Sequence, residues 1–198
     1  MSKGLETREK ILERAYLLAS KDGLEGLTIG TLADALAMSK SGLFAHFGSK
    51  EELQVAVLQH AAERFEQQVV LPAFKAPRGE PRVKKLLDNW LEWASGSSAP
   101  GGCIFVAAAA ELDDQEGRAR DYLVGSQRAL ISTLAKAARL GIEAGHFRPD
   151  LDCEQFGFDA YAVILGYHHS RRLLRDPKAD ARARQSFERL LKAARLTH

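Results

Sequence analysis

Residues 27–53, LTIGTLADALAMSKSGLFAHFGSKEEL, contain the pattern that decides the fold of this chain. Two short amphipathic segments each follow a hydroxyl residue, Thr28 and Ser39, whose side-chain oxygen can accept a backbone N–H of the first helical turn. The linker between the segments is Ala37-Met38, so the connecting turn is tight. Two short helices joined in this way predict a helix-turn-helix.

The second short helix has the composition of a helix that enters DNA. A major groove about 12 Å wide admits a helix whose exposed face has small side chains and a few hydrogen-bond donors, and the helix dipole favours phosphate at the amino end. The amino end of this helix supplies such residues: Ser39, Lys40, Ser41 and Gly42. Leu43 and Phe47, on the opposite side, are expected to hold the helix against its neighbours.

The charge pattern of this region favours the same interpretation. Residues 35–50 contain Lys40, His46 and Lys50 but no Asp or Glu, and a phosphate backbone tolerates such a surface at close range. A chance gap in acidic residues is the alternative for this segment taken alone. The formal net charge of the whole chain, +2, says little about its partners.

The rest of the sequence also predicts helices. Apolar residues recur at helical spacing and alternating strand patterns are nearly absent, so an all-α fold of about nine helices is expected, with three short ones near the amino terminus. Ser49 and Glu52 have the spacing of a capping box, which opens a long helix that ends before Pro72. The last two helices are expected over about residues 152–174 and 177–196, with Asp176 as the N-cap of the second.

Length and composition restrict the class of protein. With 198 residues, 45% of them hydrophobic and 27% charged, the chain has the values of a soluble globular protein of one or two domains. Its longest apolar run, residues 103–110, is far shorter than the ~20 residues of a membrane-spanning helix, and its amino terminus lacks the apolar core of a secretory signal. Two cysteines rule out a disulfide framework, so a cytoplasmic location without a membrane partner is expected.

The quoted motif resembles that of the tetracycline-repressor-like (TetR/AcrR) transcriptional regulators, and the resemblance covers about a quarter of the chain. It implies an all-α homodimer with a helix-turn-helix DNA-binding domain, here residues 1–50, and a helical effector-binding and dimerisation domain, here residues 51–198. The implied partners are double-stranded operator DNA and a small-molecule effector. The last two helices would form the dimer, and no cofactor is expected.

Carried over to this sequence, the resemblance implies a set of residues at the DNA. Thr28 would contact phosphate from the first short helix, and Lys50 would do so from the start of the next long helix. His46 would lie near the DNA backbone. The remaining side chains that would face DNA are Ser39, Lys40, Ser41, Gly42 and Phe44. The alternatives are solvated surface lysines at 40 and 50, a packed Phe44, and a His46 that packs on Phe47.

Three residues depart from the usual pattern of the family. Phe44 replaces Tyr, so the hydroxyl that bonds to phosphate is missing. Ala37 stands where the turn usually has Gly, which costs of order 1 kcal/mol if φ is positive. Thr31 replaces the acidic residue that usually completes the capping box of the first short helix. Either of the last two changes would slightly shift the second short helix, which is the recognition helix expected to enter the major groove.

Other functions have less support in the sequence. The chain lacks the G-x-S-x-G, glycine-rich phosphate-loop, H-E-x-x-H and paired C-x-x-C motifs, so an enzyme is not expected; a helical small-molecule enzyme or carrier is the alternative of another class. Asp113, Asp114 and Glu116 are interpreted as a solvated loop and not as a metal site. Cys103, at the amino end of an apolar helix, is either a buried small residue or a thiol switch that senses oxidants.

The effector and the partner subunit are expected to contact the carboxy-terminal helices. Candidate pocket residues, on helices where the family places its cavity, are Trp90, Trp93, Phe105, Tyr122, Gln127 and Tyr161. The aromatic rings among them predict a small, largely hydrophobic effector. The resemblance implies that this effector releases a repressor from its operator, which the twofold axis of a dimer would make palindromic. Two apolar stripes would pack as a four-helix bundle across the dimer axis: Phe156, Ala160, Val163, Ile164, Tyr167, Phe187, Leu190, Leu191 and Ala194.

Overall fold

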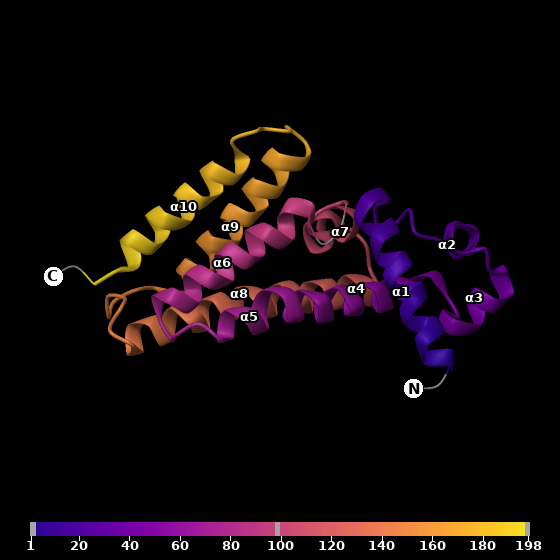
Figure 1. Cartoon of the computed structure of the whole chain (residues 1–198), viewed down its shortest axis with the longest axis horizontal. Coiled ribbons are helices and arrows are strands. Elements are labelled where there is room, and N and C mark those ends of the chain that lie inside the picture. Colours follow the sequence, from indigo (N-terminus) through magenta and orange to yellow (C-terminus); the bar gives the residue numbers. More distant parts are fainter. Residues whose placement is uncertain (1–2, 98–99, 197–198) are drawn as a thin grey trace. The chain divides into compact units, whose positions relative to one another are not determined.

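The computed structural model describes residues 3–97 and 100–196, and the regular structure in this part of the chain is helical (Figure 1). The α-helices are α1 (Lys3–Asp22), α2 (Ile29–Leu36), α3 (Lys40–Phe47), α4 (Lys50–Phe65), α5 (Leu71–Phe74), α6 (Glu80–Glu92), α7 (Ile104–Leu112), α8 (Arg118–Glu143), α9 (Cys153–Arg172) and α10 (Ala179–Ala194). Two π-helical segments, η1 (Glu66–Val70) and η2 (Trp93–Ser97), join α4 to α5 and extend α6. The described residues therefore form nine continuous helices, which confirms the all-α prediction. None of them combines the length and the apolar character that a bilayer crossing requires.

The long helix after Ser49 does not end before Pro72, as predicted, but continues to Phe74. In η1 the hydrogen bonds shift to π spacing, and the Leu71 N–H donates to the Glu66 oxygen. Pro72 is the second residue of α5 and has no N–H to donate to a carbonyl of η1. The proline therefore marks a change of hydrogen-bond spacing and not the end of the helix.

Contacts divide the chain into two compact units, and the boundaries at residues 64 and 126 fall within continuous helices. The first unit comprises Met1–Arg64 and Ser98–Ser126, and the second comprises Phe65–Ser97 and Gln127–His198. The first unit thus contains α7 and the amino-terminal part of α8 in addition to the amino-terminal helices. The separate domains expected at residues 1–50 and 51–198 remain a prediction.

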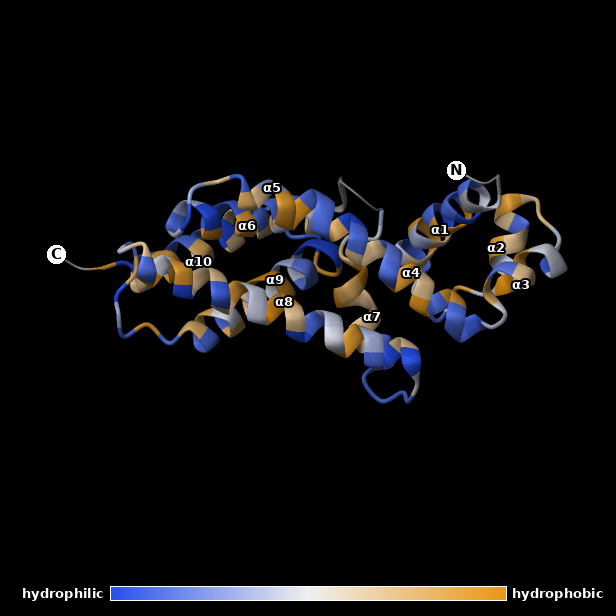
Figure 2. Cartoon of the chain, turned by 90° about the horizontal axis from the view of Figure 1, so that it is seen from below, coloured by the Kyte–Doolittle hydropathy of each residue, from blue (hydrophilic) through white to orange (hydrophobic). Residues whose placement is uncertain are grey.

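The three amino-terminal helices of the first unit enclose an apolar core. Hydrophobic and hydrophilic residues alternate along α1, α2 and α3 (Figure 2). The hydrophobic side chains that are buried include Ile11, Ala15, Leu32, Ala33, Leu43 and Phe47. Burial of Leu43 and Phe47 confirms that this side of α3 packs inward, which leaves the opposite side of the helix for another contact.

Two backbone segments of the first unit approach each other closely at Gly101. The main-chain N–H of Gly101 donates to the Ser20 hydroxyl at 3.4 Å. A Cβ atom built on Gly101 would overlap the main-chain oxygen of Ser20, near the end of α1. The segment that leads into α7 can therefore reach α1 only because residue 101 has no side chain.

In the second unit, α9 and α10 lie side by side and run antiparallel (Figure 1). The apolar stripes predicted to form the dimer interface face the interior of the protomer instead. Buried members of these stripes are Phe156, Ala160, Ile164, Tyr167, Phe187, Leu191 and Ala194, and Val163 and Leu190 are half-buried. That part of the prediction is wrong, because each helix uses its most apolar face for the core of its own protomer.

Both ends of α10 are fixed by polar contacts, although its start differs from the prediction. The helix begins at Ala179 with Lys178, and not Asp176, as N-cap. Asp176 Oδ1 instead accepts the Lys178 N–H at 2.9 Å and stabilises the preceding turn. After the other end, Arg195 pairs with Glu80 of α6, with Nε 3.0 Å from Oε2. This pair lowers the pKa of the Glu80 carboxyl from its ordinary value.

Candidate DNA-binding site

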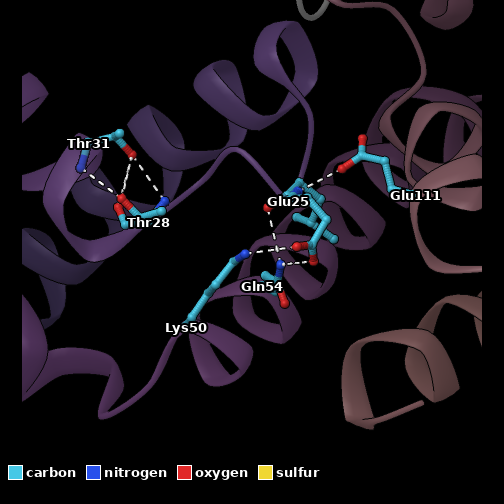
Figure 3. A network of polar contacts seen from close by, with 7 residues as sticks. Glu25, Thr28, Thr31, Lys50, Gln54 and Glu111 are labelled. Atoms are coloured by element: carbon cyan, nitrogen blue, oxygen red, sulfur yellow. Dashed lines mark hydrogen bonds and ion pairs between the residues drawn. The ribbon is translucent and has the colours of Figure 1, made fainter. Parts of the chain in front are cut away.

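The amino end of α2 is closed by two threonines. The Thr31 N–H donates to the Thr28 hydroxyl oxygen at 3.1 Å, and the Thr28 N–H donates to the Thr31 hydroxyl oxygen at 3.0 Å (Figure 3). This arrangement is a complete capping box, which satisfies two backbone donors reciprocally. Thr31 therefore completes the capping box as the acidic residue of the family would. The replacement gives no reason to expect a shift of the recognition helix.

The turn after α2 places Ala37 at positive φ, the condition on which its cost in stability depends. Its φ of +52° and ψ of +38° lie in the left-handed region, which favours glycine. The Met38 N–H donates to the Ala33 oxygen at 3.0 Å and closes the turn. Ala37 thus adopts the left-handed conformation of this turn, and its backbone strain lowers the stability of the fold.

Replacing Ala37 with glycine should therefore raise the free energy of unfolding by about 0.5–1 kcal/mol, because the strain of a Cβ at positive φ is removed. Ala45, which is exposed in the middle of α3, provides the matched control. Ala45→Gly should lower the free energy of unfolding by about 1 kcal/mol, since glycine is a poor helix former. Urea unfolding followed by circular dichroism measures both changes, and a destabilising Ala37→Gly would contradict the explanation.

The amino end of α3 presents the small polar surface that the sequence predicts. The Gly42 N–H donates to the Ser39 hydroxyl oxygen at 3.1 Å, so Ser39 is the N-cap. Its hydroxyl lies 3.3 Å from that of Ser41. A Cβ on Gly42 would lie 3.0 Å from the Ser39 oxygen, so glycine leaves room for the cap. Ser39, Lys40 and Ser41 are exposed.

Phe44 and His46 extend this surface along α3 in different ways. The Phe44 side chain is 53% exposed, so it does not pack in the core and is available for contact with a partner. The ring of His46 lies 6.3 Å from that of Phe47, and His46 is half-buried. The contact matches the packing alternative for His46, and the side chain remains partly exposed beside the candidate DNA surface.

The two candidate lysines differ in their surroundings. The Lys40 Nζ atom lies over Gly30 at the start of α2, 3.8 Å from the position of an ideal Cβ on that residue. The Lys50 Nζ atom instead forms an ion pair with Glu25 Oε2 at 2.9 Å (Figure 3). Hydrogen bonds from Lys50 and from Gln54 hold the pKa of the Glu25 carboxyl below its ordinary value. Glu25 was not among the residues expected from the sequence, because no local pattern connects residues 25 and 50.

Two family models match this chain. One, "Tetracyclin repressor-like, C-terminal domain", matches residues 79–187, which is more than half of the chain. The chain belongs to the tetracycline-repressor-like family. The second model, "Bacterial regulatory proteins, tetR family", matches residues 11–57. That range includes all the candidate DNA contacts, so the resemblance found in the sequence is confirmed.

Individual relatives support the family over different lengths. The HTH-type transcriptional repressor AcnR of Corynebacterium efficiens is 36% identical over 67 residues, so the match spans 34% of this chain and 36% of that protein. A TetR transcriptional regulator from Chloroflexus aurantiacus has a TM-score of 0.88 at 25% identity, with 100% of both chains covered. AibR, solved in complex with isovaleryl coenzyme A and operator DNA, has a TM-score of 0.75 at 22% identity and covers 94% of this chain and 99% of that one. The family fold therefore extends over the whole chain.

Three of the six residues proposed for the effector pocket, Trp90, Trp93 and Tyr161, lie close together in the second unit of this TetR-family chain. The Trp90 and Tyr161 ring centroids are 5.9 Å apart, and the Phe65 ring lies 5.7 Å from Trp90 and 5.5 Å from Trp93. Phe65, the last residue of α4, thus lies against both tryptophans. Gln127 also belongs to the second unit, whereas Phe105 and Tyr122 belong to the first. Among the described residues, the buried indole N–H of Trp90 has no hydrogen-bond partner.

The structure does not favour the rival roles considered for other polar residues. Cys103 is only 1% exposed, so its thiol is not accessible to an oxidant in this conformation. It precedes α7 as N-cap residue without a side-chain cap bond. Asp113, Asp114 and Glu116 are exposed. Within residues 3–97 and 100–196, no group of three or more His, Cys, Asp or Glu side chains is arranged to hold a metal ion.

Proposed function

We propose that this chain is a DNA-binding transcriptional regulator, a repressor that a small effector releases from its operator. The observation that carries the proposal is the exposed amino end of α3, where Ser39, Lys40 and Ser41 lie beside Phe44 in a segment without carboxylates. Donors in this position suit contact with base edges and phosphates of a major groove. AcnR, which resembles the amino-terminal part of the chain, is described as a transcriptional repressor.

A DNA-selection experiment tests the proposal. Purified protein should select a near-palindromic sequence from a random pool of 30-bp duplexes, because a twofold dimer reads two half-sites. The selected duplex is then the probe for fluorescence anisotropy. Failure to select any sequence, together with weak binding that is independent of salt, would contradict the DNA-binding function and favour the enzyme or carrier alternative.

Lys40 should contribute to sequence discrimination. Its ammonium group lies beside the start of α2 and near the amino end of the recognition helix, where a lysine can donate to guanine. Lys40→Ala should therefore reduce discrimination by about 1–3 kcal/mol at one base pair of each half-site. Lys85→Ala, which removes an equal charge from the exposed side of α6 in the second unit, is the matched control. Equal losses on selected and random duplexes would contradict base contact by Lys40.

The effector is proposed to be small and largely apolar, with one hydrogen-bond acceptor. The rings of Phe65, Trp90, Trp93 and Tyr161 supply apolar area, and the buried Trp90 indole offers an N–H that lacks a partner in the described structure. An acceptor on the ligand would satisfy this donor. AibR, of the same fold, was solved in complex with isovaleryl coenzyme A, which supports the proposal of a ligand with an apolar portion.

Trp90→Phe tests this proposal with little loss of ring area. The variant should weaken release of the selected duplex by a compound found in a thermal-shift screen by about tenfold, which corresponds to one hydrogen bond of about 1.4 kcal/mol. Release is measured as the compound concentration that halves the anisotropy change. Phe74→Leu, on an exposed side chain of α5, should leave the response unchanged. An unaltered response in Trp90→Phe would place the effector elsewhere.

The dimer is proposed to form through the outward face of α9. Phe158 is 60% exposed, Leu165 is 38% exposed, and Leu173 just after the helix is 71% exposed. Residues 158 and 165 are two helical turns apart and share one face. Ala162 and Gly166 on this face are small and exposed, which permits a second helix to approach closely. This apolar face, and not the buried stripe predicted from the sequence, is available to a partner subunit across a twofold axis.

A further inference from the structure

The carboxylate of Glu111, near the end of α7, is directed at the loop that joins α1 to α2. One of its oxygens accepts the main-chain N–H of Glu25 at 2.6 Å (Figure 3). The same carboxylate fills the space beside Gly23, where an ideal Cβ would lie 2.8 Å from Oε1. The loop is therefore fixed by a residue 86 positions away in the sequence. Glu111 lies in the range matched by the C-terminal family model, whereas Glu25 lies in the N-terminal one.

The side chain of Glu25 is in turn held on two sides. One carboxylate oxygen accepts from Lys50 Nζ at 2.9 Å, and the other accepts from Gln54 Nε2 at 3.0 Å. Gln54 is buried and also donates to the Leu24 oxygen at 3.2 Å. An ion pair between two solvated side chains has no such additional hydrogen bonds that hold its carboxylate in place. The carboxylate is thus kept beside the Lys50 ammonium group by contacts from both its backbone and its side chain.

We propose that Glu25 competes with DNA phosphate for Lys50, and that Glu111 is the positioning residue that keeps Glu25 in place. This inference rests on the proposed DNA-binding function. In the free protein, the Glu25 carboxylate neutralises the Lys50 ammonium group, and on DNA the ammonium group is transferred to a phosphate. Both charges of the pair are about half exposed, so the exchange with phosphate needs no unfolding. A displacement of α7 would alter the position of Glu25 and thereby the availability of Lys50.

The salt dependence of DNA binding separates this mechanism from a purely structural role. A lysine that neutralises one phosphate contributes about 0.9 to the slope of log K against log[salt], because it releases a counterion. In the wild type, transfer of Lys50 leaves the Glu25 carboxylate unpaired, and this carboxylate takes up a cation. The two effects oppose each other, so the net contribution of Lys50 should be small until Glu25 loses its charge.

A double-mutant cycle measures this coupling. Wild type, Glu25→Gln, Lys50→Ala and the double variant are compared on the 30-bp duplex that the wild type selects, over a range of KCl concentrations. Glu25→Gln should tighten binding about threefold to fivefold when Lys50 is present, as expected for loss of an exposed ion pair, and much less in the Lys50→Ala background. Lys50→Ala should lower the salt slope by about 0.9 in the Glu25→Gln background and by much less in the wild-type background.

Glu111 is tested by removal and by conservative rescue. Glu111→Ala should tighten binding in the same direction as Glu25→Gln, and this gain should disappear when Lys50→Ala is added. Glu111→Gln should behave as the wild type, because the amide oxygen still accepts the Glu25 N–H. Glu116→Gln, which neutralises an exposed carboxylate of the same unit, is the control for general electrostatics and should leave the salt slope unchanged.

The possible outcomes distinguish the inference from the proposed function. Additive effects of Glu25→Gln and Lys50→Ala on affinity and slope would overturn the competition, even if the wild type binds DNA tightly. A Glu111→Gln variant that behaves as Glu111→Ala would overturn the positioning role of the hydrogen bond. If the wild type binds no duplex in a salt-dependent manner, the proposed function fails and this inference fails with it.

Discussion

Gly101→Ala should lower the free energy of unfolding by more than about 3 kcal/mol, which exceeds the cost of most single substitutions. A Cβ at this position would overlap the main-chain oxygen of Ser20. A flexible side chain can move away from such an overlap, but a backbone oxygen near the end of α1 moves only with its helix. The Gly101 N–H would then lose its bond to the Ser20 hydroxyl as well. Urea unfolding followed by circular dichroism measures the change.

Gly125→Ala is the matched control for this prediction. Gly125 lies in α8 within the same unit, is exposed, and has no atom within 4 Å of an ideal Cβ. Alanine is favoured over glycine inside a helix, so this variant should gain up to about 1 kcal/mol. A Gly101→Ala variant with wild-type stability would show that the approach of residues 20 and 101 is not needed for the fold.

Phe158→Glu should convert the dimer to a monomer and weaken binding to the selected palindromic duplex by about a hundredfold or more. The large side chain is 60% exposed on the outward face of α9, and a twofold axis would bring two copies of it to the same interface. Two carboxylates there would lose apolar contact and would repel each other. Loss of the dimer removes the gain that comes from linking two half-site contacts.

Sedimentation equilibrium and anisotropy together test the dimer prediction. Gln185→Glu adds the same charge to an exposed position of α10 and should leave both the dimer and the DNA affinity unchanged. Because Phe158 is exposed, Phe158→Glu should retain the thermal unfolding signal of a folded protomer. A Phe158→Glu protein that remains dimeric at micromolar concentration would place the interface on another surface.

Features that depend on a few neighbouring residues could be predicted from the sequence alone. The hydroxyl groups of Thr28 and Ser39 cap α2 and α3 as predicted. The inward side of α3, with Leu43 and Phe47, is buried as its spacing predicts. These features are local because a cap or a helical face involves residues at most four positions apart. The same local pattern carried the resemblance to the TetR family.

Contacts between side chains that are far apart in the sequence depend on how the helices pack. The bond between Glu25 and Glu111 joins residues 86 positions apart, and the pair of Glu25 with Lys50 joins residues 25 positions apart. No period or spacing in the sequence encodes such contacts, because they depend on how whole helices pack. For the same reason, the apolar stripes of α9 and α10 were wrongly assigned to the dimer interface. Periodicity shows that a helix has an apolar face but not which partner covers that face. Packing within the protomer covers Phe156 and Phe187, and leaves Phe158 exposed.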